Sequence, residues 1–178
     1  MIQGRIVEMN AKNVSDINAA NQPFEVIGRL VPSFYDGAWS FSERLYQKAY
    51  HKSYPNDEEH YADYIGHPEK IVYFYYDGKA CAGQIRLRKN WNRYAFIEDI
   101  AVAAFHRGRG VGSKLIEKAR EWAQAKGLLG FMLETQDVNL LACRFYHKLG
   151  FKIGGVDTML YANFDNANER AVFWYQKF

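Results

Sequence analysis

The stretch from Ile97 to Lys126 most constrains how this chain folds, because its pattern changes from strand to helix across a glycine-rich turn. After the turn, apolar residues recur with the 3.6-residue period of an amphipathic helix. Gly127 follows at the position where a glycine commonly ends a helix. The pattern predicts that the inward-facing residues are Val111, Leu115, Ile116, Ala119, Trp122 and Ala123.

The turn itself predicts an anion site, because backbone N–H groups at a helix N-terminus face outward and glycines allow close approach. Its glycines, at 108, 110 and 112, do not fit the dinucleotide pattern G-x-G-x-x-G or the P-loop pattern G-x-x-x-x-G-K-[ST]. They do fit R-x-x-G-x-G, carried by Arg107, Gly110 and Gly112. A plain strand-to-helix connection is the alternative interpretation of the turn alone.

A second motif spans Asn139–Phe151 and reads N-x-x-A-x-x-F-Y-x-x-x-G-F. An amphipathic helix with aromatic core residues would give a similar pattern, and we expect this structural role for Phe145 and Phe151. Tyr146 is a functional candidate, because this motif follows the glycine-rich turn after about one helix and one strand.

Together the two motifs resemble the acetyl-coenzyme A site of the GCN5-related N-acetyltransferase (GNAT) superfamily. This resemblance implies acetyl-CoA as cosubstrate and Tyr146 as the general acid that protonates the departing thiolate. The residues it implies for coenzyme binding are Ile100, Ala101, Val102, Arg107, Gly108, Arg109, Gly110, Val111, Gly112, Ser113, Asn139, Ala142 and Tyr146.

A narrower resemblance covers essentially the whole chain, although more loosely in its N-terminal half. The stretches KNWNRYAFIEDIAV, MLETQDVNLLACRFYHKLGFKIGGVDTMLYANF and AVFWYQKF are similar to the streptothricin acetyltransferases. That family acetylates an amino group on the β-lysine part of streptothricin antibiotics. The resemblance therefore implies a small cationic amine as substrate.

The acceptor chemistry requires a base, because an alkyl amine with a pKa near ~10.4 is protonated at neutral pH. Glu98 and Asp99 are adjacent on the strand before the turn, and strand alternation predicts that they face opposite sides. We prefer Glu98 as the base, with Asp99 a close second that holds the substrate's ammonium groups. The acid that points away is expected to pair with Arg86 or Arg88.

Two further expectations concern the rest of the site. Backbone N–H groups near Val102, where the superfamily commonly has a bulge, are expected to stabilise the oxyanion. A polyamine substrate favours an acidic, aromatic pocket, although any of the aromatic residues could instead be sheet core. The predicted substrate-binding residues are Glu98, Asp99, Glu134, Asp137, Asp157, Tyr161, Tyr35 and Trp39.

The acidic segment Asn56–His60 is expected to complement a helix dipole rather than to form a pocket rim.

The order of strand-like and helix-like patterns along the whole chain predicts an α+β fold with a mixed, largely antiparallel sheet flanked by helices. Strands are predicted at Gly4–Met9, in a hairpin over 24–50, in a meander over 71–102, at Phe131–Glu134, and at 151–164 and 171–178. The 178 residues, 48% of them hydrophobic, fit a single domain, with a variable part at 1–68 and a coenzyme-binding, catalytic part at 69–178.

Composition excludes several classes of function. There is no apolar run long enough to span a membrane and no signal-peptide core, and Cys81 and Cys143 lack metal-ligand spacing. We therefore expect a cytoplasmic enzyme without a metal or membrane partner. A net charge of +3 with scattered Lys and Arg argues against nucleic-acid binding. A homodimer is compatible with the final strand, because two-chain assemblies are common in the superfamily.

Two other functions compete with antibiotic acetylation. One is acetylation of protein lysines or N-termini, against which the long hairpin argues mildly because peptide substrates need an open groove. The other is a non-catalytic acyl-CoA-binding module, which would be favoured by loss of the acid and the tyrosine. Both Glu98 and Tyr146 are present.

Overall fold

The computed structural model describes residues 4–56 and 59–178, and its chain forms two compact units. The first unit contains the chain up to Pro23, Ser53–Gly130 and Phe178, and the second contains Phe24–Lys52 and Phe131–Lys177. Asp57 and Glu58, part of the acidic segment predicted to complement a helix dipole, lie outside the described residues.

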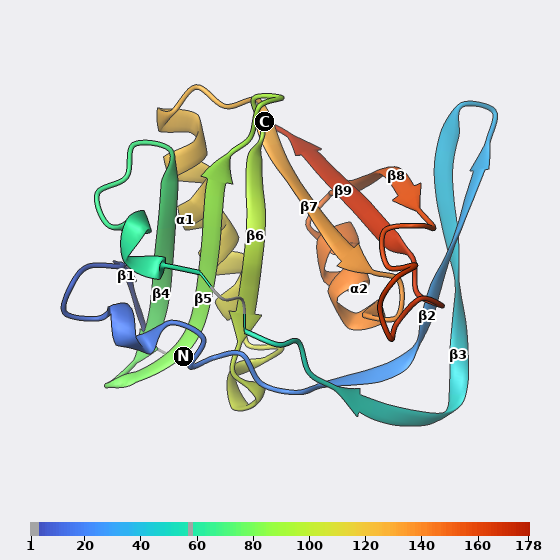
Figure 1. The fold of residues 1–178 in the computed structure, drawn as a ribbon, viewed down its shortest axis with the longest axis horizontal. Coiled ribbons are helices and arrows are strands. Elements are labelled where there is room, and N and C mark those ends of the chain that lie inside the picture. The colour runs from blue at the N-terminus through green and yellow to red at the C-terminus, as the bar shows by residue number, and fades with distance from the viewer. Residues whose placement is uncertain (1–3, 57–58) are drawn as a thin grey trace. The chain divides into compact units, whose positions relative to one another are not determined.

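The first unit is built on four strands in the order β1-β4-β5-β6, and each neighbouring pair is antiparallel (Figure 1). The meander β4–β5–β6 and its two turns confirm the sequence prediction. The strands span β1 (Arg5–Glu8), β4 (Lys70–Asp77), β5 (Ala80–Lys89) and β6 (Ala95–Val102).

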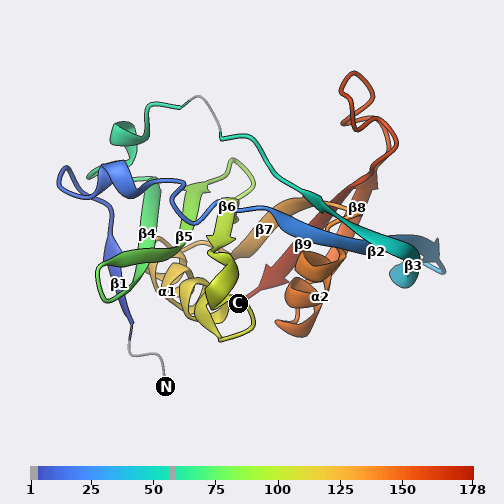
Figure 2. The same cartoon turned by 90° about the horizontal axis from the view of Figure 1, so that it is seen from below.

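Both faces of this sheet are covered. Side chains on both faces of β4 are therefore buried, which explains why its sequence is a continuous apolar run. Helix α1 (Val111–Ala125) lies on one face, and the N-terminal segment with the short helices η1 (Val14–Asp16) and η2 (Tyr61–Tyr64) lies on the other (Figure 2). Phe74 packs on the η2 side with Tyr64. Tyr73, on the opposite face, lies under the ammonium group of Lys118 from α1.

Helix α1 agrees closely with its sequence pattern. All six residues predicted to face inward are buried, and no other residue of the helix is. Gly127 ends the helix with a φ of 64°, a left-handed conformation that favours glycine. A third short helix, η3 (Ala104–His106), leads from β6 into the glycine-rich turn.

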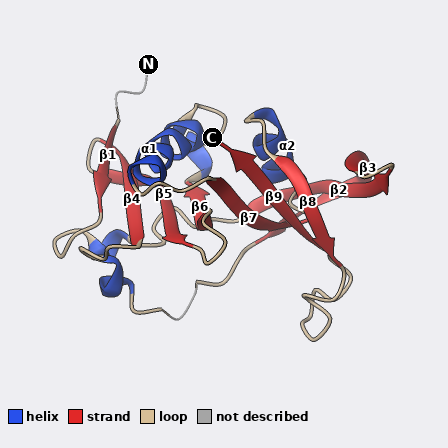
Figure 3. Ribbon diagram, turned by 90° about the horizontal axis from the view of Figure 1, so that it is seen from above, coloured by secondary structure: helices blue, strands red, loops and turns tan. Residues whose placement is uncertain are grey.

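The second unit combines a hairpin with a three-stranded segment in the order β7-β9-β8, of which β8 and β9 are antiparallel (Figure 3). The hairpin β2–β3 turns at Asp36-Gly37, as predicted. Because β9 has β7 and β8 as neighbours, it does not offer a free edge to a second chain. The elements are β2 (Phe24–Tyr35), β3 (Ala38–Lys52), β7 (Gly130–Gln136), α2 (Leu140–Lys148), β8 (Lys152–Asp157) and β9 (Ala171–Lys177).

Two details of the second unit differ from the sequence prediction. The strand expected over 151–164 ends at Asp157, because the carboxylate of Asp157 accepts hydrogen bonds from the N–H groups of Met159 and Leu160 and starts a turn. Phe145, expected in the core, is only half-buried, whereas Tyr146 is buried. None of the helices in the described residues is long and apolar enough to cross a membrane.

Candidate active site

The glycine-rich turn forms an open N-terminus on helix α1. Gly108 and Gly110 have φ values of 71° and 85°, in the left-handed region that disfavours other residues. A Cβ at either glycine would meet no atom within 4 Å, so the space above the loop is open. Because the first N–H groups of a helix lack intrahelical acceptors, those of residues 111–113 are suited to bind phosphate oxygens. The loop therefore fits the pyrophosphate of a coenzyme.

Arg107 holds this loop in place. Its guanidinium donates hydrogen bonds to three backbone carbonyls, those of Val102 at 2.8 Å, Pro23 at 2.7 Å and Gln22 at 2.9 Å. Partial burial lowers the pKa of Arg107 below its ordinary value. Arg109 differs, because its guanidinium lies 4.3 Å above the ring of the exposed Phe105. Arg107 thus anchors the loop, and Arg109 is the more available charge.

The two acids of β6 lie on the same face of the sheet, and the prediction of opposite faces is wrong. Arg86 pairs with Asp99 while Leu87 pairs with Ile97, so Glu98 is the extra residue of a β-bulge. The bulge interrupts the alternation of side chains between Glu98 and Asp99. The predicted bulge near Val102 is not seen in this pairing, which is regular from Asp99 to Val102.

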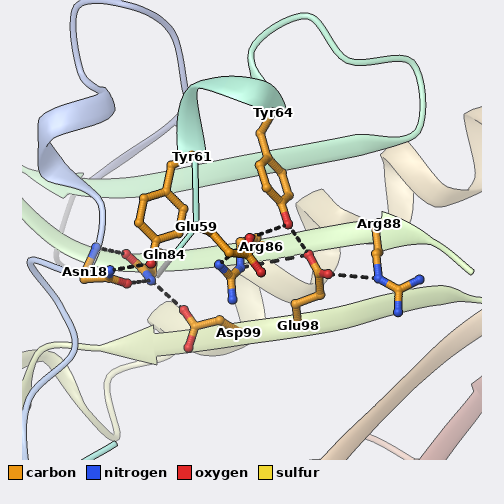
Figure 4. A network of polar contacts seen from close by, with 9 residues as sticks. All are labelled: Asn18, Glu59, Tyr61, Tyr64, Gln84, Arg86, Arg88, Glu98 and Asp99. Carbon is orange, nitrogen blue, oxygen red and sulfur yellow. Dashed lines mark hydrogen bonds and ion pairs between the residues drawn. The ribbon is translucent and has the colours of Figure 1, made fainter. Parts of the chain in front are cut away.

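The Glu98 carboxylate is held by donors from two other elements (Figure 4). The Tyr64 hydroxyl donates to Oε2 at 2.6 Å, and Nε of Arg88 donates to Oε1 at 2.9 Å. Nε of Arg86 lies 3.9 Å from Oε2. The pairing of one acid with Arg86 or Arg88 was expected, but we expected it for the acid that points away from the cleft. Glu98, the preferred base, is the acid that these arginines hold.

Asp99 is held by an amide instead. Nε2 of Gln84 donates a hydrogen bond of 2.5 Å to Oδ2 of Asp99, and the Gln84 side chain also contacts Asn18. Nearby, the buried Arg86 donates to Glu59 at 3.1 Å, and its guanidinium lies 5.5 Å from the ring centre of Tyr61. Polar residues thus line the face of the first unit opposite α1 (Figure 4).

In the second unit, Tyr146 is only 6% exposed and packs in an aromatic cluster. Its ring centre lies 5.6 Å from that of Phe151 and 6.3 Å from that of Trp174. Asn139, the first residue of the motif, caps α2 by accepting the N–H of Ala142 at 3.3 Å. The motif therefore fixes the helix that carries Tyr146.

The predicted substrate residues of the second unit are only partly brought together. The Tyr161 hydroxyl donates a hydrogen bond to Glu134, and burial raises the pKa of the Glu134 carboxyl although this bond opposes the rise. Asp137 is 1% exposed and forms an ion pair of 3.1 Å with Arg29.

The aromatic candidates of the hairpin lie apart from this group. Tyr35 and Trp39 are at the hairpin tip, about 17 Å along β2 from Leu30, whose N–H binds the Asp137 carbonyl. Tyr35 is 84% exposed, so it packs in no core.

Sequence reasoning missed the residues that hold the acids, namely Asn18, Tyr64 and Gln84. A signal exists for Gln84, because polar residues alternate with Ile85 and Leu87 along β5 and so share one face. Asn18 and Tyr64 lie in irregular segments without a pattern of their own.

These features define a class: a strand with acids, a glycine-rich loop at a helix N-terminus, and a second helix with a buried tyrosine. The chain belongs to the Acetyltransferase (GNAT) family, whose model matches residues 33–151. It is therefore an N-acetyltransferase that uses acetyl-CoA.

Within that family the chain belongs to the streptothricin acetyltransferases. It is 49% identical to streptothricin acetyltransferase A of Bacillus subtilis (strain 168), over 97% of this chain and 99% of that protein. It is 34% identical to a streptothricin acetyltransferase of Escherichia coli, over 92% of this chain and 82% of that protein.

Solved structures agree with this placement. A protein of Bacillus anthracis str. Ames, assigned as a streptothricin acetyltransferase and crystallised with acetyl coenzyme A, matches with a TM-score of 0.90 at 35% identity. That match covers 99% of this chain and 98% of the other. The predicted fold class, a single GNAT-like α+β domain, is confirmed. The division of that domain at residues 68 and 69 stays a prediction.

Proposed function

We propose that this protein inactivates streptothricin antibiotics by transferring an acetyl group from acetyl-CoA to an amino group of their β-lysine part. The observation that supports this most is the 49% identity to streptothricin acetyltransferase A along nearly the whole of both chains. Three carboxylates on the face of the first unit opposite α1, those of Glu59, Glu98 and Asp99, add support. Carboxylates suit a substrate with several ammonium groups.

The proposed reaction is direct transfer within a ternary complex. A β6 carboxylate, Glu98 or Asp99, takes a proton from the ammonium group directly or through a water molecule. The free amine attacks the thioester carbonyl, which forms the C–N bond and a tetrahedral intermediate whose oxyanion is stabilised by backbone N–H groups near Val102. The C–S bond then breaks, Tyr146 gives its proton to the leaving thiolate, and the second proton lost by the nitrogen restores the tyrosine hydroxyl.

The coenzyme role of the other predicted residues is part of the same proposal. Backbone groups of Ile100 and Ala101 face the pantetheine arm, and the loop from Arg107 to Ser113 holds the pyrophosphate. Burial raises the pKa of the Cys143 thiol to about 12, so this cysteine is a poor nucleophile and fits a mechanism without a covalent enzyme intermediate. We place the reaction in the cytoplasm, since both cysteines are free thiols. A homodimer remains a prediction.

Thiol release from acetyl-CoA by the purified protein tests this function. Streptothricin, free lysine and an unrelated aminoglycoside are compared as acceptors. Rapid turnover with streptothricin alone supports the proposal. Binding of acetyl-CoA without transfer to any of the three amines contradicts it and favours protein acetylation or a non-catalytic role.

A further inference from the structure

Phe105 is an exposed aromatic residue directly before the glycine-rich loop, and the proposed reaction gives it no task. It is 70% exposed, and it belongs to the short helix η3 together with His106, whose side chain is only 11% exposed. A single exposed phenyl ring needs no functional explanation by itself. The two neighbours that this ring contacts, Arg109 and His106, connect it to the coenzyme loop.

The first contact places a charge on the ring. The guanidinium of Arg109 lies 4.3 Å from the centre of the Phe105 ring, which is within the range of a cation–π interaction. Arg109 directly precedes Gly110, the N-cap of α1. Within residues 4–56 and 59–178, Arg109 forms no ion pair. Because a ring face leaves the N–H donors of a guanidinium in the plane of that group, they remain available to phosphate oxygens.

The second contact fixes the ring. The His106 ring meets the Phe105 ring edge to face, with centroids 5.3 Å apart and an interplanar angle of 82°. His106 is held in turn, because its Nε2 lies 3.0 Å from Oδ2 of Asp77 at the end of β4. Asp77 and His106 thus anchor the Phe105 ring to the turn between β4 and β5.

This support matters because a free arginine side chain has many rotamers. A ligand that binds such a side chain must order it, and this loss of freedom lowers the affinity. A guanidinium that already rests on a fixed ring has lost part of that freedom before the ligand arrives. The ring can therefore strengthen the binding of a phosphate without touching it.

We infer that Phe105 is a positioning residue for acetyl-CoA: its ring preorganises Arg109 for a phosphate of the coenzyme, and Asp77 and His106 hold the ring. The inference rests on the part of the proposed function that puts the pyrophosphate at the glycine-rich loop. It does not depend on which amine accepts the acetyl group.

The test is calorimetric titration of the purified protein with acetyl-CoA at low and high NaCl. Phe105→Leu removes the ring and keeps an apolar side chain. We expect Kd to rise about two- to fivefold at low salt, the change that corresponds to one exposed cation–π contact. The rise should shrink at high salt, because salt screens Arg109 from the phosphates. Phe105→Tyr keeps the ring and should bind as the wild type does.

A double-mutant cycle separates an action through Arg109 from a direct contact with the coenzyme. If the ring acts through the guanidinium, Phe105→Leu should have no further effect on Kd in the Arg109→Met background. A loss that persists in that background would mean that the ring touches the coenzyme itself, and it would overturn the inference. By the same reasoning, His106→Leu should weaken binding in the wild type but not in Phe105→Leu.

The remaining outcomes are also decisive. An unchanged Kd in Phe105→Leu, or a rise that is equal at low and high salt, contradicts the inference. Since Phe105 is exposed, its leucine variant should keep the wild-type urea midpoint, and a lower midpoint together with weaker binding would indicate a structural role instead. A wild type that binds acetyl-CoA but does not acetylate streptothricin contradicts the proposed function alone, because streptothricin takes no part in the titration.

Discussion

The hydroxyl of Tyr64 donates a hydrogen bond of 2.6 Å to Oε2 of Glu98, a residue 34 positions further along the chain. The ring of Tyr64 is buried in the apolar cluster under η2, and only its polar end reaches the acid. Burial first, and then the bond to Glu98, raise the pKa of Tyr64 well above its ordinary value. The hydroxyl therefore remains a donor at any physiological pH.

Tyr64→Phe removes this donor and keeps the ring. We expect the free energy of unfolding to fall by about 1–2 kcal/mol, because one oxygen of a largely buried carboxylate loses its partner. Urea denaturation at pH 8 measures this. Tyr35→Phe is the matched control, since Tyr35 is 84% exposed and its change should have almost no effect. Equal effects of the two changes would contradict the interpretation.

Buried tyrosines predict how stability depends on alkaline pH. Burial is the largest cause that raises the pKa of Tyr73, to about 12, from an ordinary value of 10.0. Because the pKa of Tyr73 is higher in the folded state than in the unfolded state, the un-ionised tyrosine contributes to the free energy of unfolding. This contribution is complete below pH 10.0 and is lost as the pH rises toward the folded pKa. The urea midpoint should decline above about pH 10, and the decline should be shallower in Tyr73→Phe. An unchanged slope in that variant would exclude Tyr73 as a cause.

Local patterns predicted much of this fold from sequence. Helix α1 was predicted with its six buried residues and its final glycine, because period and caps are properties of neighbouring residues. The hairpins were predicted for the same reason, since Asp36-Gly37 and Asp77-Gly78 are short-range turn signals.

Features that depend on distant partners were not predictable in this way. The bulge at Glu98 is defined by pairing with β5, and it puts the two acids on one face instead of the expected opposite faces. The contact between Asn18 and Gln84 joins residues 66 positions apart. Tyr146 was predicted to be functional from its motif, and its ring packs against Trp174 from a later strand.

Asp137 is a case where the structure suggests a stabilising role for a predicted substrate residue. Its carboxylate is 1% exposed, pairs with Arg29 and accepts the N–H of Arg170 at 3.1 Å. Asp137→Asn should lower the free energy of unfolding by about 2–3 kcal/mol, because it leaves the Arg29 charge without its buried partner. Glu43→Gln is the control, since its pair with Arg144 is exposed and is worth less than about 1 kcal/mol. Both values come from urea denaturation, and a stable Asp137→Asn with a raised KM for streptothricin would instead favour the substrate role.

The two arginines of the glycine-rich loop should respond differently to salt. Arg107→Lys loses the planar donor set that binds three carbonyls, so KM for acetyl-CoA should rise about tenfold at any ionic strength. Arg109→Met removes an exposed charge, and its effect on KM should shrink as salt screens the phosphates. Steady-state kinetics at low and high NaCl measure both. Matching salt dependences would show that both arginines act in the same way.

Glu134 should trade stability for function. Burial raises the pKa of its carboxyl above the ordinary value of 4.5, so the charged form is costly in the folded state at neutral pH. Glu134→Gln keeps an acceptor for the Tyr161 hydroxyl and removes the charge. Because the folded pKa is the higher one, the variant should be more stable than the wild type at pH 7–8, and the gain should vanish below about pH 4.5, where both states of the wild type are protonated. Urea midpoints across this pH range measure this effect on stability.

Glu134→Gln should also raise KM for streptothricin about tenfold if this carboxylate meets an ammonium group, as one lost charged contact predicts. Thiol release from acetyl-CoA measures this KM. A gain in stability without any change in KM would place Glu134 outside the substrate site.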